Sequence, residues 1–238
     1  MDTSSSSALS APSAPIIPSS RSSRLTILIS GNGTNLQALI DAAADSTLPH
    51  TTIVRVISNR KAAYGLQRAT AASIPTHYHP LPPYKSQHPS TPAGVLEARH
   101  AYDRDLAAVV LADAPDLVVC AGWMHVLSPA FLDVVAAAKV PVINLHPALP
   151  GQFDGANAIQ RAYEAFRKGE VSKTGVMVHR VVTEVDRGEP VVVKEVEMRE
   201  GDVEEEVERR VRDAERPLLV EGTRVVLARL RGEQPSHG

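Results

Sequence analysis

The chain has 238 residues, and its 25 lysines and arginines against 27 aspartates and glutamates give a formal net charge of −2. That balance excludes the general electrostatic attraction by which nucleic acids or anionic membranes are bound. With 43% apolar residues and one cysteine, wholesale disorder and a disulfide scaffold are also excluded. We expect a cytoplasmic protein without a membrane span, because no apolar stretch approaches the ~18 residues that one needs.

The two ends differ in composition from the rest of the chain. Residues 1–23 contain ten serines and a single bulky apolar pair, Ile16-Ile17, which predicts a disordered tail. An organelle transit peptide is the alternative for this tail, but no amphipathic helix is apparent in it. Residues 24–231 are expected to fold as one domain, and residues 232–238 are expected to fray.

Apolar strands alternate with amphipathic helices from Leu25 onward. Because helices of ten or more residues separate the strands, the sheet should be mainly parallel and covered by helices on both faces. The run 80–94, which holds five prolines, is expected to be a mobile surface loop. The expected strands are 25–29, 52–58, 117–121 and 140–145, and the expected helices are 62–72, 95–112, 129–138, 156–167 and one that carries Leu36, Leu39, Ile40 and Ala43 on one face.

The last third of the chain changes character. Two β-rich runs, 175–182 and 190–198, are joined by only seven residues, too few for a crossover helix, so they should pair as an antiparallel hairpin. A helix follows, with Asp202 expected at its N-cap, Glu205 three residues on, and an apolar stripe up to Ala214. Together these patterns predict the α/β class, with a Rossmann-like sheet and a C-terminal antiparallel hairpin.

Ligands of an open parallel sheet bind beyond the carboxyl ends of its strands, and three turns at such ends have unusual sequences. The first, 30–35, has two glycines before a helix N-terminus and suits a single phosphate monoester. A tight turn that merely needs glycine is the alternative. The second, 121–127, could line a binding site for a flat aromatic ligand or simply pack at a strand end.

The third turn closes a strand with Asn144-Leu145-His146-Pro147. Alternation along the strand puts Asn144 and His146 on one side, about 7 Å apart. An amide donor beside a group that titrates near neutrality suits proton transfer next to a developing oxyanion, although a structural histidine is the alternative. Asp186, in the connection of the hairpin, contributes to such a site only if it reaches His146.

Seven short segments, in this order and spacing, are typical of one enzyme family: 28–38, 57–60, Ala101-Tyr102-Asp103, 121–124, 127–131, 144–147 and Asp186-Arg187-Gly188. Over about residues 25–230 the chain resembles the phosphoribosylglycinamide formyltransferases, also called GAR transformylases, which are folate-dependent. The resemblance implies the formyltransferase fold. It also implies transfer of a formyl group from 10-formyltetrahydrofolate to the amine of glycinamide ribonucleotide in purine biosynthesis.

Position by position, the resemblance implies that Asn144, His146 and Asp186 are catalytic. Asn144 and protonated His146 would donate hydrogen bonds to the oxyanion, and Asp186 would stabilise the imidazolium and pass the proton on through water. The implied contacts to the ribonucleotide are Gly33, Thr34, Asn35 and Glu215. The implied contacts to the folate are Arg99, Trp123, Met124, His125, Val126 and Leu127. The chain departs from many relatives after Pro147, where Ala148-Leu149-Pro150 is one residue shorter than Ser-Leu-Leu-Pro, and at His125, where bacterial members often have arginine.

Other functions fit the sequence less well. A methionyl-tRNA formyltransferase would need a C-terminal nucleic-acid-binding domain, and neither nucleic acid nor membrane is expected as a partner. The alternatives that stay open are a 10-formyltetrahydrofolate hydrolase, although 23 serine-rich residues cannot form its extra N-terminal domain, and a catalytically silent nucleotide-binding module. No metal site is expected, because His77, His79 and His88 lack a cysteine or carboxylate at ligand spacing. The quaternary state is open between monomer and homodimer.

Overall fold

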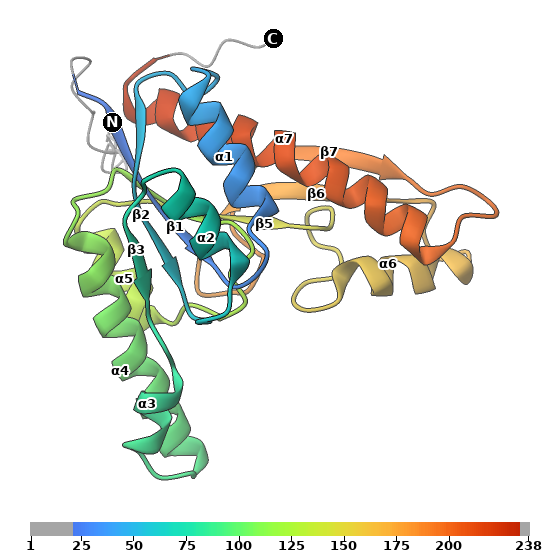
Figure 1. The fold of residues 1–238 in the computed structure, drawn as a ribbon. Helices are drawn as coiled ribbons and strands as arrows, with labels where there is room; N and C mark the ends of the chain where they lie inside the picture. Colours follow the sequence, from blue (N-terminus) through green and yellow to red (C-terminus); the bar gives the residue numbers. More distant parts are fainter. Residues whose placement is uncertain (1–20, 234–238) are drawn as a thin grey trace, which may run out of the picture.

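The structure, a computed structural model, describes residues 21–233. The predicted tail, 1–23, and the predicted frayed end, 232–238, therefore lie mostly outside the described residues. Figure 1 shows the arrangement of the helices and strands. The strands are β1 (Ser23–Ile29), β2 (Thr51–Ser58), β3 (Thr76–Tyr78), β4 (Leu117–Cys120), β5 (Val142–His146), β6 (Lys173–Arg180) and β7 (Pro190–Glu197). The helices are α1 (Thr34–Ala44), α2 (Tyr64–Ala71), α3 (Pro82–Ser86), α4 (Pro92–Leu111), α5 (Pro129–Ala137), α6 (Ala158–Arg167) and α7 (Glu204–Leu230).

The strands form one sheet in the order β3-β2-β1-β4-β5-β6-β7. The first five strands in the chain run parallel, whereas β6 pairs antiparallel with both β5 and β7. The connection between β6 and β7 is too short for a helix, and it therefore reverses the chain. The predicted mainly parallel sheet with a C-terminal antiparallel hairpin is confirmed.

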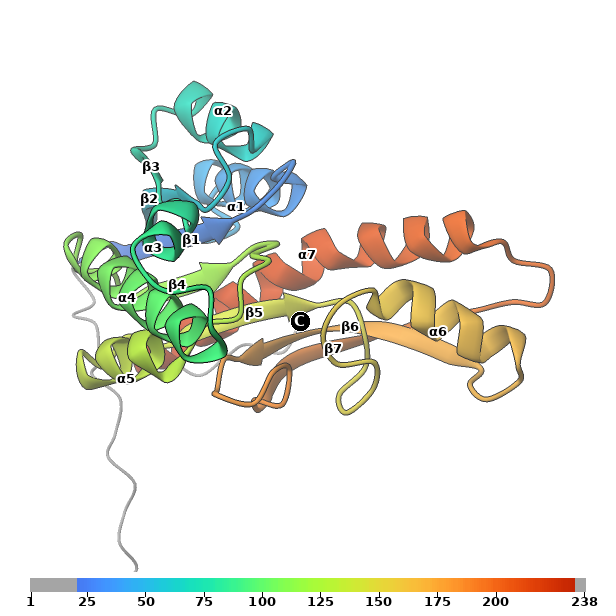
Figure 2. The same cartoon turned by 90° about the horizontal axis from the view of Figure 1, so that it is seen from below.

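Helices cover both faces of the sheet. Figure 2 shows α1 and α7 on one side of it and α4 and α5 on the other. Each layer has its own core, and β1 contributes to both because successive side chains point to opposite faces. Leu25, Ile27 and Ile29 lie in the core under α1 and α7, and Leu28 lies in the core under α4 and α5. A strand buried on both faces reads as a continuous apolar run, which is why the sequence revealed it.

The predicted loop 80–94 is wrong in part, because α3 and the first turn of α4 lie within it. Three of the five prolines that suggested a loop, Pro82, Pro83 and Pro92, occupy the first positions of these helices, where a missing N–H costs nothing. Thr91 completes the start of α4, since its hydroxyl accepts a hydrogen bond from the Gly94 N–H. The three-residue strand β3 was not predicted either; it pairs with the end of β2.

The start of α7 also differs from the prediction. Asp202 does not cap the helix; its carboxylate accepts the Arg199 N–H at 2.7 Å and pairs with Arg210 instead. The Glu206 carboxylate accepts the N–H of Val203, the true N-cap residue, at 3.4 Å. From there α7 runs along β6 and β7, and this packing brings its residues to the edge of the sheet where β5 ends.

Candidate active site

The register of the sheet brings the three predicted turns to one edge. Leu28 on β1 is paired with Cys120 on β4, which is paired with Asn144 on β5. The turns that follow these strands therefore leave the sheet side by side. Two hydrogen bonds join the first two turns: the Ser30 N–H donates to the Gly122 carbonyl, and the Met124 N–H donates to the Ser30 hydroxyl at 2.9 Å.

Asn144, His146 and Asp186 meet at the end of β5. The His146 Nδ1 atom lies 3.2 Å from one Asp186 carboxylate oxygen, and the Asn144 amide nitrogen lies 3.3 Å from the other. The side chains of His146 and Asp186 are 5% and 9% exposed, so water screens their interaction weakly. The structure thus brings the amide, imidazole and carboxylate together, although 42 residues of sequence separate Asn144 from Asp186.

The loop after β5 holds Asp186 from the other side. The Gly155 N–H donates at 2.8 Å to the same Asp186 carboxylate oxygen that faces His146, and Arg187 pairs with Asp154 at 2.5 Å. Asp186 itself has a φ of 56°, a left-handed conformation that aspartate tolerates better than most residues. Despite the shorter sequence after Pro147, this loop therefore closes over the hairpin connection and fixes the carboxylate.

His179 is a buried member of this cluster that the sequence analysis missed. It lies on β6 opposite Asn144, and its Nε2 atom is 3.2 Å from the Asn144 amide nitrogen and 3.4 Å from Asp186. Its Nδ1 atom lies 2.8 Å from the Arg180 carbonyl oxygen, a geometry that assigns a proton to Nδ1. Only the antiparallel register of β5 and β6 reveals this neighbour, since nothing in the local sequence around His179 marks it.

Burial and neighbouring charges shift both titrating members of the cluster. Burial lowers the pKa of His146 below its ordinary value; Asp186 opposes that shift and His179 adds to it. Burial alone would raise the pKa of Asp186, but His179, the Gly155 N–H and His146 together hold it below its ordinary value. Near neutral pH the resting cluster therefore holds a neutral His146 ring beside an ionised Asp186. The His146 Nε2 atom is buried and has no hydrogen-bond partner among the described residues.

The first turn presents a helix N-terminus at the same edge. Gly33 has a φ of 75° and precedes α1, which has no side-chain cap, so backbone N–H groups of its first turn are free for an anion. A Cβ on Gly33 would lie 2.6 Å from the Gly65 Cα. Arg68, which the sequence analysis did not single out, donates to the Asn32 carbonyl at 2.9 Å and braces this turn.

Glu215 joins the first turn from α7. Its carboxylate accepts a hydrogen bond from the Asn35 side-chain amide at 3.2 Å, although the two residues are 180 positions apart. Both side chains are buried, and burial raises the pKa of Glu215 while the Asn35 hydrogen bond partly opposes that shift. The predicted members of the ribonucleotide site, Gly33, Thr34, Asn35 and Glu215, are therefore brought together.

The second turn forms a short segment with alternating exposure. Met124 and Val126 are 68% and 49% exposed, whereas Trp123, just before them, and Leu127, just after them, are buried. Arg99 on α4, which the resemblance implies as a folate contact, donates to the Val126 carbonyl oxygen at 3.3 Å and so lies beside this turn. The exposed apolar side chains leave a surface on which a flat ligand can lie.

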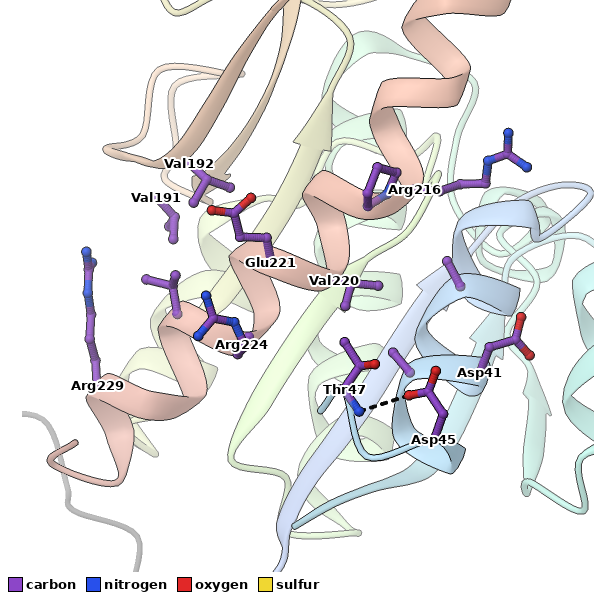
Figure 3. A pocket seen from close by; sticks show the side chains of 14 residues that line it. Asp41, Asp45, Thr47, Val191, Val192, Arg216, Val220, Glu221, Arg224 and Arg229 are labelled. Atoms are coloured by element: carbon purple, nitrogen blue, oxygen red, sulfur yellow. Dashed lines mark hydrogen bonds between the residues drawn. The ribbon is translucent and has the colours of Figure 1, made fainter. Parts of the chain in front are cut away.

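A separate hollow of about 770 Å³ lies between α1, α7 and the start of β7, lined by charged and apolar side chains (Figure 3). No member of the Asn144 cluster lines it, and it is not part of the site. Within residues 21–233, no group of three or more histidine, cysteine or carboxylate side chains could hold a metal ion. His79 instead packs on the Tyr102 ring, with 4.4 Å between the ring centroids.

Across the described residues, 21–233, no helix is long and apolar enough to cross a membrane.

Comparisons with known proteins agree on one family. The family model described as formyl transferase matches residues 23–223. A phosphoribosylglycinamide formyltransferase of Schizosaccharomyces pombe is 46% identical over 204 residues, which cover 85% of this chain and 96% of the relative. One from Saccharomyces cerevisiae is 47% identical over 175 residues, which cover 72% and 81%. Among solved structures, the phosphoribosylglycinamide formyltransferase of Coxiella burnetii superposes with a TM-score of 0.71 at 34% identity, covering 87% of this chain and 88% of the other.

Proposed function

The chain belongs to the formyl transferase family, and on that premise we infer that it has phosphoribosylglycinamide formyltransferase activity. It transfers the formyl group of 10-formyltetrahydrofolate to the amine of glycinamide ribonucleotide in purine biosynthesis, giving formylglycinamide ribonucleotide and tetrahydrofolate. The observation that carries the residue assignments is the convergence of Asn144, His146 and Asp186 at the end of β5. The relatives named above give no support to a hydrolase or a silent binding module.

The reaction needs a donor to an oxyanion and a carrier for one proton. The substrate amine attacks the formyl carbon, a C–N bond forms, and the carbonyl electron pair moves to oxygen. Asn144 exchanges its resting contact with Asp186 or His179 for a hydrogen bond that it donates to that oxyanion. The unpaired Nε2 of neutral His146 takes the proton of the attacking nitrogen and returns it to the folate nitrogen as the bond to the formyl carbon breaks and the carbonyl re-forms.

Asp186 supports this proton transfer electrostatically. Its pKa is held below the ordinary value, so it stays ionised near neutrality and is poorly suited to carry the proton itself. Its contact with the His146 Nδ1 atom stabilises the imidazolium that forms when Nε2 takes a proton. This geometry favours His146 as the proton carrier over the expected path through Asp186 and water.

In our proposal the two substrates bind neighbouring turns beside this cluster. The phosphate of the ribonucleotide binds the backbone of Gly33, Thr34 and Asn35 at the start of α1, where free N–H groups and the helix dipole favour an anion. Glu215 accepts a hydrogen bond from the ribonucleotide. The folate lies on the turn 123–127, with Arg99 at its side.

We propose that one chain holds a complete site. All the residues named above belong to one sheet and its helices, which supports a single formyltransferase domain over residues 24–231 and makes a partner subunit unnecessary for activity.

The cytoplasm is the compartment in which we expect the enzyme to act. Fractionation of cells that express the intact chain tests the compartment.

The test is an absorbance assay of folate deformylation with and without glycinamide ribonucleotide, combined with isothermal titration of the ribonucleotide. We expect turnover only when the amine substrate is present. Turnover without the amine would identify a hydrolase, and binding without turnover would identify a silent module; either result would overturn the proposal.

A further inference from the structure

A fully buried carboxylate stands behind the second turn, outside the residues assigned above. Asp103 lies on α4, one turn after Arg99, and none of its side chain is exposed. One carboxylate oxygen accepts a hydrogen bond from His125 Nε2 at 2.7 Å, and the other accepts the Ser128 N–H at 2.9 Å. No lysine or arginine pairs with it among the described residues. Burying a carboxylate costs several kcal/mol unless its oxygens are satisfied, so these two hydrogen bonds stabilise it where it lies.

Both donors belong to the turn that bears the proposed folate contacts. His125 and Ser128 bracket Val126 and Leu127, so the two oxygens of one rigid carboxylate fix the turn at both ends of this stretch. The Arg99 hydrogen bond to the Val126 carbonyl oxygen adds a third contact from α4 between them. Polar contacts from one helix therefore hold the part of the turn from His125 to Ser128, while Ser30 holds Gly122 and Met124.

Buried and exposed side chains alternate along the turn, which shows why these hydrogen bonds from α4 matter. Trp123, His125 and Leu127 point inward; the His125 ring bonds to Asp103, whereas the buried indole N–H of Trp123 has no hydrogen-bond partner among the described residues. Met124 and Val126 point outward, with no core beneath them to keep them in place. A slip of one residue would exchange the two sets. The His125 hydrogen bond to Asp103 is satisfied in one register alone.

We propose that Asp103, acting through His125 and Ser128, is a positioning residue that sets the shape of the folate-binding turn. The role rests on the proposed function, because it presumes that Met124 and Val126 contact the formyl donor. Loss of the His125 hydrogen bond should weaken binding of 10-formyltetrahydrofolate and leave the ribonucleotide site at Gly33 unaffected.

The test compares His125→Leu, which cannot donate to Asp103, with His125→Gln, whose amide can. We expect His125→Leu to raise the KM for 10-formyltetrahydrofolate about tenfold, the size of a lost hydrogen bond to a charged group, and to leave the KM for the ribonucleotide and kcat within about twofold. His125→Gln should restore most of the donor KM. His88→Gln, a change at a histidine in the connection between α3 and α4, is the control and should change neither KM.

Trp123 gives a readout that does not depend on catalysis. It is the only tryptophan in the chain, and its ring centroid lies 6.3 Å from that of His125, so its emission reports directly on the turn. In His125→Leu the emission should shift to longer wavelength and become easier to quench with acrylamide. The circular dichroism spectrum of the variant should match that of the wild type, which shows that the secondary structure is kept.

The outcomes separate the two hypotheses. An inactive wild-type protein would overturn the proposed function, and this inference with it. If the wild type is active, two results would overturn the positioning role alone. In the first, His125→Leu keeps its KM for 10-formyltetrahydrofolate within twofold of wild type. In the second, both KM values rise and kcat falls together, and His125→Gln does not restore them.

Discussion

Asn144 is the residue whose role can be tested most directly, because its amide is the proposed donor to the oxyanion. Loss of one such donor typically lowers turnover by ~10²–10³. We therefore expect Asn144→Ala to lose kcat by about that factor while keeping both KM values close to wild type. Steady-state kinetics measures the loss, and circular dichroism checks that the variant folds. A variant with ordinary turnover would remove Asn144 from the mechanism.

His146 makes a prediction about pH. Burial lowers its pKa below 6.5, so the neutral ring that accepts the proton persists to a lower pH than it would in an exposed histidine. The acid limb of kcat/KM should consequently lie below pH 6.5. In Asp186→Asn the limb should move to still lower pH, because the carboxylate that raises the pKa of His146 is gone, and the plateau rate should fall. A pH–rate profile of each enzyme checks this, and a wild-type acid limb above pH 6.5 would contradict it.

At the scale of elements, the turn between β1 and α1 depends on the backbone of Gly33. Alanine at a φ of 75° is strained, and its Cβ would meet the Gly65 backbone at 2.6 Å. We expect Gly33→Ala to lose ~1–3 kcal/mol of unfolding free energy and to raise the KM for the ribonucleotide more than that for the folate. Urea unfolding and steady-state kinetics measure the two effects.

Gly31→Ala is the matched control for stability in the same turn. A Cβ on Gly31 meets nothing within 4 Å, and its backbone is not left-handed, so alanine should cost no stability there. If both alanine variants unfold at the same urea concentration, the strain argument for Gly33 does not hold.

Sequence patterns predicted the helices and strands that are determined by nearby residues. They missed those that depend on contacts with distant parts of the chain. The strand β1 reads as an apolar run because it is buried on both faces, and the hairpin of β6 and β7 follows from the length of its connection. Prolines at the starts of α3 and α4 were interpreted as a loop because a proline marks either a break or a first helical position. Which of the two applies depends on tertiary packing that the sequence does not display.

The site residues also divide into those that local sequence patterns indicate and those that only distant contacts bring to the site. Asn144 and His146 share one strand, so their proximity follows from alternation, and the resemblance to a family added Asp186. His179 and Asp103 reach the site through strand register and helix packing, and each is buried against partners at least 22 positions away. A single sequence carries no signal for such contacts, since a lone histidine or aspartate is compatible with many environments.

At the scale of the whole molecule, the described fold places the full set of proposed site residues in one chain. β5, β6 and the hairpin connection supply the catalytic cluster, and α1 with its preceding turn, the turn after β4, α4 and α7 supply the rest. Activity per chain should therefore be independent of whether the protein is a monomer or a homodimer. We expect constant specific activity from nanomolar to micromolar enzyme, with the assembly state at each concentration measured by analytical ultracentrifugation. Loss of activity that follows dissociation of a dimer would mean that a second chain completes the site, and the assignment of all contacts to one chain would then be wrong.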